Sequence, residues 1–129
     1  MKTIEINSLV LAYLGDSIYE SYVREYLISL GTFHVKELQE KSLEYVSARS
    51  QSKILNDLID KNIFTKEELE IIKRGRNQKS HTSPKNADII DYKCATGFEA
   101  LVGYLYLSEE KERLEYIIYK GISIIENNM

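Results

Sequence analysis

Residues 7–30 read NSLVLAYLGDSIYESYVREYLISL, and the apolar side chains of this stretch recur at intervals of three and four residues. This spacing predicts a long amphipathic helix that buries one wide face. Asn7 or Ser8 is a suitable N-cap and Gly31 is a suitable stop, so we expect the helix to end at about Leu30. The residues of the apolar face are Leu11, Leu14, Ile18, Tyr22 and Tyr26.

The rest of the chain continues the helical pattern and contains few helix breakers. Thr65 and Glu68 have the spacing of a capping box, which predicts a helix that starts at Lys66 and ends near Gly75. The chain has one proline and six glycines, a usage that favours long helices with few turns. We therefore predict an all-α bundle of about six helices. The other expected helical segments are 35–61, with a bend at 47–50, then 88–107 and 110–126.

The size and composition of the chain indicate its class. It has 129 residues, of which 43% are hydrophobic, and this is enough for one compact domain spanning residues 1–129. The single cysteine, Cys94, excludes an intramolecular disulfide and a multi-cysteine zinc site, and its place in the apolar pattern predicts a buried thiol. No stretch of the sequence approaches the roughly 18 to 20 apolar residues that span a bilayer. We expect a soluble protein of the reducing cytoplasm.

Positive charge is concentrated in one segment of the chain. Residues 73–86, KRGRNQKSHTSPKN, contain five basic residues and no acidic residue, whereas the rest of the chain has 12 basic and 20 acidic residues. Clustered Lys and Arg among small polar residues favour contact with the phosphates of a polyanion. A solvated connection between two helices is the alternative interpretation. The basic residues of the segment are Lys73, Arg74, Arg76, Lys79 and Lys85.

Two acidic residues, Asp16 and Glu99, lie within apolar helical segments, where an unpaired carboxylate is unfavourable. Gly15 precedes Asp16, and a glycine in the middle of a helix indicates the close approach of a second helix. Two carboxylates that meet across packed helices would form a hard oxygen site suited to Mg²⁺ or Mn²⁺. The alternative is that each acid pairs with an arginine or caps a turn.

Two motifs in this chain resemble the catalytic motifs of the ribonuclease III family. They are LGDS at residues 14–17 and FEALVGYLYL at residues 98–107. The runs at residues 73–77 and 92–101 extend the resemblance to the compact branch of the family, which lacks a double-stranded RNA-binding domain. The resemblance implies a homodimeric, all-helical nuclease domain that cuts double-stranded RNA with Mg²⁺, for which Mn²⁺ can substitute.

Within this resemblance, Asp16 and Glu99 match the metal-binding and catalytic acids of the family. Two further acids of the longer family members are absent, because Ala12 and Thr96 occupy their positions one turn before the retained acids. With half the usual negative charge, a second Mg²⁺ would depend on RNA phosphate oxygens and water for its ligands. Glu20, one turn after Asp16, is a weaker candidate for a supporting acid.

The resemblance also implies the products and the partners of the reaction. Hydrolysis would leave 5′-phosphate and 3′-hydroxyl ends, and a dimer would cut both strands. We expect Tyr13 and Tyr19 at the dimer interface, or else packed inside one protomer. Precursor RNA of the large ribosomal subunit is the implied substrate, with a ribosomal protein as a candidate partner. The expected RNA contacts are Lys73, Arg74, Arg76, Asn77, Lys79 and Lys85.

Two other functions compete with the nuclease hypothesis. A catalytically silent RNA-binding protein would keep the helical fold and the basic segment without turnover. An all-helical nucleotide pyrophosphohydrolase would also use Mg²⁺ and facing carboxylates, but the acidic clusters at residues 67–70 and 109–112 do not have the spacing that such an enzyme needs. We therefore predict an Mg²⁺-dependent endoribonuclease, with the silent RNA-binding protein as the alternative.

Overall fold

The computed structural model describes residues 2–78 and 88–129. Within these residues every regular element is a helix, which confirms the predicted all-α fold class. No described helix combines the length and the apolar character that crossing a membrane requires. The elements are η1 (Thr3–Glu5), α1 (Ser8–Ser29), α2 (Val35–Val46), α3 (Ala48–Asp60), α4 (Lys66–Asn77), α5 (Ile89–Leu107) and α6 (Lys111–Glu126).

The ends of α1 follow from the capping chemistry of its sequence. The side chain of Asn7 accepts a hydrogen bond of 2.8 Å from the amide of Leu9, and the helix begins at Ser8. Beyond the other end, Gly31 has a φ of 99°, a left-handed conformation that glycine adopts without strain. Both predicted boundaries of this helix are confirmed.

The predicted bend in residues 35–61 divides that segment into α2 and α3. Ser47 leaves the helical conformation, with a φ of −61° and a ψ of 154°, and its hydroxyl accepts a 3.1 Å hydrogen bond from the amide of Ser50. Ser47 therefore ends α2 and caps α3. The change of direction brings the first turn of α3, including Gln51, into contact with α5.

Helix α4 begins with the predicted capping box. The amide of Thr65 donates a 2.9 Å hydrogen bond to the carboxylate of Glu68, and the amide of Glu68 donates a 3.1 Å hydrogen bond to the hydroxyl of Thr65. The helix continues two residues beyond the end that we expected near Gly75. The reason is that Gly75 packs closely against Gly97 of α5 instead of forming a turn.

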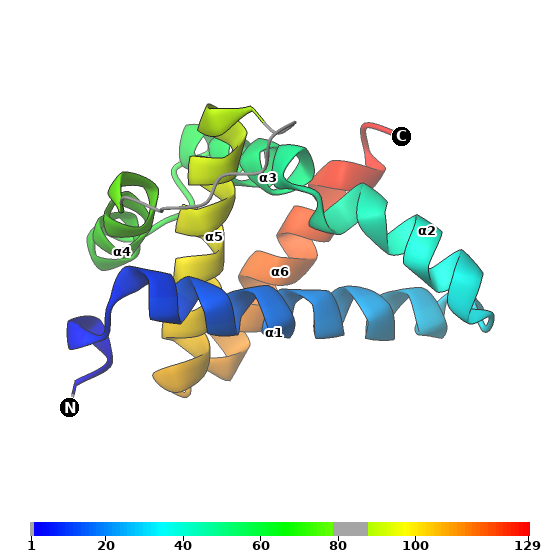
Figure 1. Ribbon diagram of the computed structural model, residues 1–129, viewed down its shortest axis with the longest axis horizontal. Helices are drawn as coiled ribbons and strands as arrows, with labels where there is room; N and C mark the ends of the chain where they lie inside the picture. Colours follow the sequence, from blue (N-terminus) through cyan, green and yellow to red (C-terminus); the bar gives the residue numbers. More distant parts are fainter. Residues whose placement is uncertain (1, 79–87) are drawn as a thin grey trace.

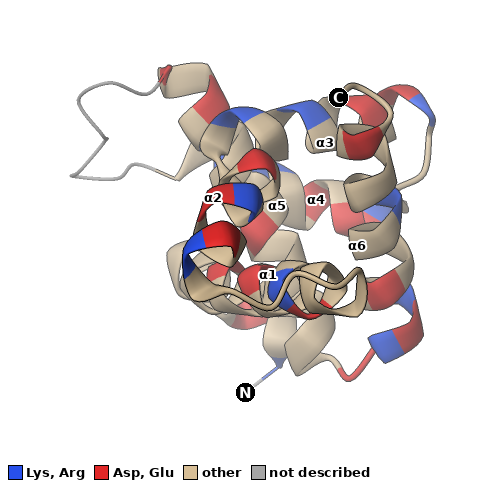
Figure 2. Ribbon diagram, turned by 90° about the vertical axis from the view of Figure 1, so that its right-hand side faces the viewer, with Lys and Arg blue, Asp and Glu red and all other residues tan. Residues whose placement is uncertain are grey.

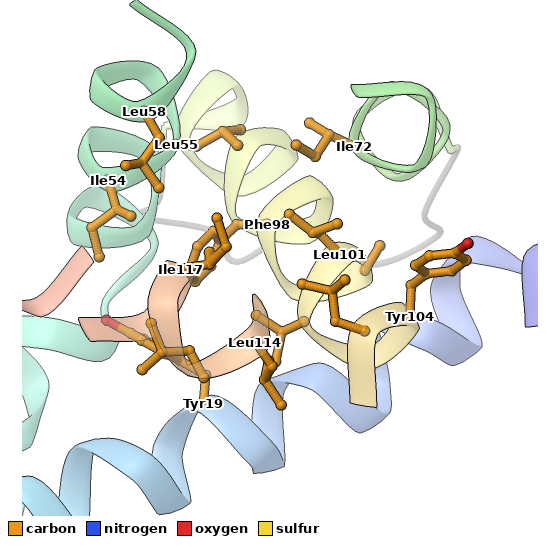
Figure 3. Close-up of a cluster of buried hydrophobic side chains, with 14 of the residues drawn as sticks. Tyr19, Ile54, Leu55, Leu58, Ile72, Phe98, Leu101, Tyr104, Leu114 and Ile117 are labelled. Carbon is orange, nitrogen blue, oxygen red and sulfur yellow. The ribbon is translucent and has the colours of Figure 1, made fainter. Parts of the chain in front are cut away.

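Helix α5 is the centre of the fold, and α1, α3, α4 and α6 all pack against it. Figure 1 shows α5 running across the long axis of α1, with α4 on one side and α3 on the other. In Figure 3, Phe98 and Leu101 of α5 lie among buried side chains from the surrounding helices. The labelled neighbours are Tyr19 of α1, Ile54, Leu55 and Leu58 of α3, Ile72 of α4, and Leu114 and Ile117 of α6.

Glycines allow α1 and α5 to cross with their backbones in contact. A Cβ atom on Gly15 would overlap the carbonyl oxygen of Glu99, and a Cβ atom on Gly103 would overlap the carbonyl oxygen of Leu11. Only glycine leaves room for this approach, because every other amino acid carries a Cβ atom. The prediction that Gly15 marks a close helix approach is confirmed.

The two tyrosines expected at a dimer interface lie in different environments. Tyr19 is fully buried, packs edge-to-face on Phe98 with ring centroids 5.3 Å apart, and donates a 2.9 Å hydrogen bond to the carbonyl of Tyr45. It therefore packs inside the protomer, and its assignment to an interface is wrong. Tyr13 is 85% exposed. The predicted burial of Cys94 is confirmed.

Candidate active site

Asp16 of α1 and Glu99 of α5 meet where the two helices cross, and their carboxyl groups share a hydrogen bond. The absence of a side chain on Gly15 lets α1 lie directly on the backbone of Glu99. Asp16 is exposed, whereas Glu99 is half-buried. The structure thus brings together the two carboxylates that the sequence analysis selected.

The surroundings of Glu99 disfavour its negative charge. Burial raises the pKa of Glu99 to about 9, and the charge of Asp16 and the hydrogen bond between the two carboxyls act in the same direction. The amide of Gln51 acts in the opposite direction, because it donates a 3.2 Å hydrogen bond to Oε2 of Glu99. Glu99 therefore holds a proton more tightly than an ordinary glutamate, because its pKa is raised by burial and by the neighbouring Asp16.

Gln51 is a residue of this site that the sequence analysis did not identify. It is 2% exposed, and its Nε2 contacts both Glu99 and the backbone carbonyl of Val46. A signal was present in the sequence, because this glutamine interrupts the apolar face of α3 one turn before Ile54 and Leu55. A polar side chain on such a face requires a polar partner in the interior.

The neighbouring positions add no further carboxylate at the crossing. Ala12 and Thr96 are both buried, and the hydroxyl of Thr96 donates a 3.0 Å hydrogen bond to a backbone carbonyl of its own helix. Glu20 forms an exposed ion pair within α1, and its charge contributes to the raised pKa of Glu99. Among the described residues, no three His, Cys, Asp or Glu side chains gather into a group that could hold a metal.

The donor set at the crossing fits a hydrated divalent cation. In the described parts of the chain, neither Asp16 nor Glu99 has a Lys or Arg side chain within ion-pair distance. Mg²⁺ prefers oxygen ligands and keeps several waters when a protein supplies only one or two carboxylates. A divalent cation would offset the mutual repulsion of the two carboxylates, so the charge of the donor set matches such an ion.

The basic segment is described only in part. Lys73, Arg76 and Asn77 are exposed at the C-terminal end of α4, while Lys79 and Lys85 lie outside the described residues. Figure 2 shows acidic and basic positions interspersed over the helices, so these cations do not belong to a uniformly basic face. Their positive charge is local, as the sequence indicated.

Arg74 has a second contact that the sequence analysis did not anticipate. Its guanidinium is half-buried and donates hydrogen bonds of 2.7 and 3.2 Å to the carbonyls of Ile4 and Ile6, which holds the N-terminal segment against α4. A surface pocket of about 810 Å³ adjoins this contact, and Lys66 and Lys73 also line it. Three cations thus border one concave surface between α4 and the start of α1.

Comparison with known proteins identifies the family. A family model described as the Ribonuclease III domain matches residues 9–110, which include Asp16 and Glu99. The chain belongs to the ribonuclease III family. A relative named Mini-ribonuclease 3 from Enterococcus faecalis is 49% identical over 114 residues, which are 88% of this chain and 86% of the relative. Another Mini-ribonuclease 3, from Brevibacillus brevis, is 48% identical over 120 residues, which are 93% of this chain and 88% of the relative.

A solved structure has the same fold as this chain over its whole length. The crystal structure of a protein from Fusobacterium nucleatum matches with a TM-score of 0.84 and 32% sequence identity, and the match covers 100% of both chains. The matches to the Ribonuclease III domain and to the relatives named Mini-ribonuclease 3 confirm the resemblance to the compact branch of the ribonuclease III family, and this family member is an endoribonuclease. Family enzymes generally use a divalent metal ion, which agrees with the paired carboxyls of Asp16 and Glu99.

Proposed function

We propose that this ribonuclease III family member hydrolyses double-stranded RNA with Mg²⁺ bound at Asp16 and Glu99, and that Mn²⁺ can replace Mg²⁺. The observation that carries the proposal is the carboxyl pair at the crossing of α1 and α5. This pair has no cationic side chain within ion-pair distance in residues 2–78 and 88–129. Two adjacent carboxyl groups without a cationic partner are suited to hold a divalent cation.

The chain's own residues would position the reaction. When bound, a divalent cation supplies positive charge that stabilises the reacting phosphate and lowers the pKa of water. Asp16 and Glu99 would hold the cation as carboxylates, and Gln51 would orient the Glu99 carboxylate through its 3.2 Å hydrogen bond. Attack of water on phosphorus breaks the bond to the 3′ oxygen, so the products have 5′-phosphate and 3′-hydroxyl ends.

The proposed RNA contacts are the basic side chains at the end of α4 and in the segment that follows. Lys and Arg bind the phosphates of an RNA duplex, and such contacts read the shape of the duplex and not its bases. Two of these side chains, Lys73 and Arg74, line the surface pocket between α4 and the start of α1 together with Lys66, which supports this assignment. The residues are Lys73, Arg74, Arg76 and Asn77, together with Lys79 and Lys85.

Replacing Arg76 with alanine is expected to weaken binding of any RNA duplex and to reduce the slope of log affinity against log salt by about one. The slope falls because one phosphate contact fewer releases fewer counterions. Fluorescence anisotropy with a labelled duplex at several salt concentrations measures both quantities. Lys36→Ala is the matched control, since Lys36 is also exposed but lies on α2, at the opposite end of the molecule from α4 (Figure 1). An unchanged slope for Arg76→Ala would argue against a phosphate contact.

The proposed functional unit is a homodimer with one active site for each RNA strand. Tyr13 supports this arrangement because it is 85% exposed on the helix that carries Asp16. Val10, one turn earlier on the same face, is 57% exposed. Exposed aromatic and aliphatic side chains that lie together favour a protein interface. Contact between two copies of α1 would bring two Asp16 side chains to the same duplex.

We also propose that the natural substrate is precursor RNA of the large ribosomal subunit, processed in the cytoplasm with a ribosomal protein as a candidate partner. The motifs at residues 14–17 and 98–107, through their resemblance to the compact branch of the family, support this substrate. The unpaired thiol of Cys94 agrees with a reducing compartment.

Cleavage of a labelled RNA duplex tests the proposed function. The wild-type protein is expected to cut the duplex only when Mg²⁺ or Mn²⁺ is present, and to leave single-stranded RNA intact. Asp16→Asn is expected to lose this cleavage, because an amide replaces a negatively charged ligand. Asp57→Asn serves as a control, because Asp57 forms an exposed ion pair with Lys61 at 3.2 Å. If the duplex is bound but stays intact with either metal, the protein is the silent RNA-binding alternative.

A further inference from the structure

Gln51 is a buried polar side chain beside the carboxyl pair. It is 2% exposed and lies on the face of α3 that packs into the core, one turn before the fully buried Ile54 and Leu55. A glutamine in such a place is unfavourable unless its polar atoms find partners. The Nε2 atom of Gln51 has hydrogen-bond partners, whereas the Oε1 atom has none among the described residues.

The orientation of the Gln51 amide is determined by its contacts. Nε2 donates a 2.9 Å hydrogen bond to the carbonyl oxygen of Val46 and a 3.2 Å hydrogen bond to Oε2 of Glu99. A backbone carbonyl can only accept a hydrogen bond, so the atom that faces Val46 must be the nitrogen whatever the protonation state of Glu99. The oxygen therefore occupies the other corner of the same amide.

Oε1 of Gln51 is buried and has no hydrogen-bond partner among residues 2–78 and 88–129. Unpaired buried oxygens of this kind are rare in folded proteins, and water or an ion is the usual partner. Because the amide group is small and rigid, Oε1 lies close to the Glu99 carboxylate that Nε2 contacts. An acceptor without a donor is thus placed beside the proposed cation ligands.

We propose that Gln51 is a third polar group of the active site, whose Oε1 accepts a hydrogen bond from a water molecule that the divalent cation carries. Its Nε2 orients Glu99 at the same time. The inference rests on the proposed metal-dependent function. It gives Gln51 part of the role of the absent acids at Ala12 and Thr96, because a neutral amide adds an acceptor without adding a third negative charge.

The fold explains why Nε2 of Gln51 is buried, because this donor has two hydrogen-bond partners. It does not explain the buried acceptor Oε1. Val46 is the last residue of α2, and the carbonyls at the end of a helix lack partners within that helix. Nε2 therefore caps α2 in addition to contacting Glu99. A test must separate the loss of this donor from the loss of the Oε1 acceptor.

Two substitutions make this separation. Gln51→Met keeps the unbranched shape of the side chain but removes both the donor and the acceptor. Gln51→Glu removes the donor and keeps an oxygen acceptor. Titration with Mn²⁺, followed by the electron paramagnetic resonance signal of the free ion, measures metal affinity without RNA or turnover. Circular dichroism melting in the absence of metal verifies that each variant is folded.

We expect Gln51→Met to weaken Mn²⁺ binding about tenfold to a hundredfold, and Gln51→Glu to bind Mn²⁺ at least as tightly as the wild-type protein. The proposal is overturned if Gln51→Met binds Mn²⁺ like wild type, or if Gln51→Glu binds as weakly as Gln51→Met. Ser52→Ala is the matched control, because Ser52 is the next residue of α3, is 4% exposed and contacts Asn56 instead of Glu99. Its Mn²⁺ affinity should equal that of wild type.

A further variant separates failure of this inference from failure of the proposed function. If Glu99→Gln and the wild-type protein bind Mn²⁺ with the same affinity, the proposed cation site is wrong, and so is the proposed role of Gln51. If Glu99→Gln loses Mn²⁺ binding while Gln51→Met retains it, only the role of Gln51 is wrong.

Discussion

Glu99→Gln is expected to lower duplex cleavage on the order of a thousandfold and to raise the stability of the metal-free protein. Cleavage falls because the amide removes one of the two negative charges that would hold the cation. Stability rises because the variant lacks a buried carboxyl group whose ionisation is less favourable in the folded state than in the unfolded state. The opposite signs of the two effects indicate a functional residue that is retained at the expense of stability.

The stability gain should depend on pH in a defined direction. The pKa of Glu99 is about 9 in the folded protein, above its ordinary value of 4.5, so the folded state binds this proton more tightly than the unfolded state. The contribution of Glu99 to stability is therefore complete below about pH 4.5 and is lost as the pH rises towards 9. Relative to wild type, Glu99→Gln should gain roughly 1–3 kcal/mol at pH 8 and little at pH 4.5.

Urea denaturation at pH 4.5 and pH 8, together with the duplex cleavage assay, measures both effects. Glu25→Gln is a suitable control, because Glu25 is an exposed residue of α1. It should change neither the cleavage rate nor the pH dependence of stability. If Glu99→Gln is less stable than wild type at pH 8, the raised pKa of Glu99 does not describe the protein.

Gly15→Ala is expected to destabilise the protein by about 3 kcal/mol or more, although alanine normally stabilises a helix relative to glycine. The added methyl group would overlap the carbonyl oxygen of Glu99, which is backbone and cannot rotate away. The helices α1 and α5 would have to separate, and the packing around Phe98 and Leu101 would loosen (Figure 3).

Gly121→Ala provides a matched comparison for this prediction. Gly121 is also a buried helix glycine, but the atoms that a Cβ would meet belong to the side chain of Ile54, the closest at 2.9 Å. A side chain can shift, so we expect a smaller loss than at Gly15, which urea denaturation of both variants would resolve. Equal losses, or a gain at Gly15, would mean that the close backbone crossing does not limit stability.

Much of the fold could be predicted because its signals are local. Helix boundaries depend on caps that lie within a few residues of the helix, such as Asn7 for α1 and the pair of Thr65 and Glu68 for α4. The one misplaced boundary, near Gly75, shows the limit of this reasoning. A glycine has the same local signature whether it ends a helix or lies against another helix, as Gly75 does against Gly97.

Tyr19 and Arg74 show why the surroundings of a side chain could not be predicted from local signals. Both residue types suit an exposed contact surface, so the sequence leaves Tyr19 between a dimer interface and the protomer interior and predicts an RNA contact for Arg74. The structure buries Tyr19 against Phe98 and gives Arg74 two carbonyl partners in the N-terminal segment. These contacts join parts of the chain that are distant in sequence, so no local pattern reports them.

The sequence by itself determined the helices, the family motifs and the identity of the two acids, Asp16 and Glu99, because periodicity, caps and residue chemistry are properties of short segments. Only the tertiary structure decided how those acids are arranged. The crossing of α1 and α5 at Gly15 and Gly103 places the two carboxyls in contact, and the bend at Ser47 brings Gln51 to Glu99. A pKa, an unpaired oxygen and a site for a cation depend on distances between segments, which arise only when the helices pack.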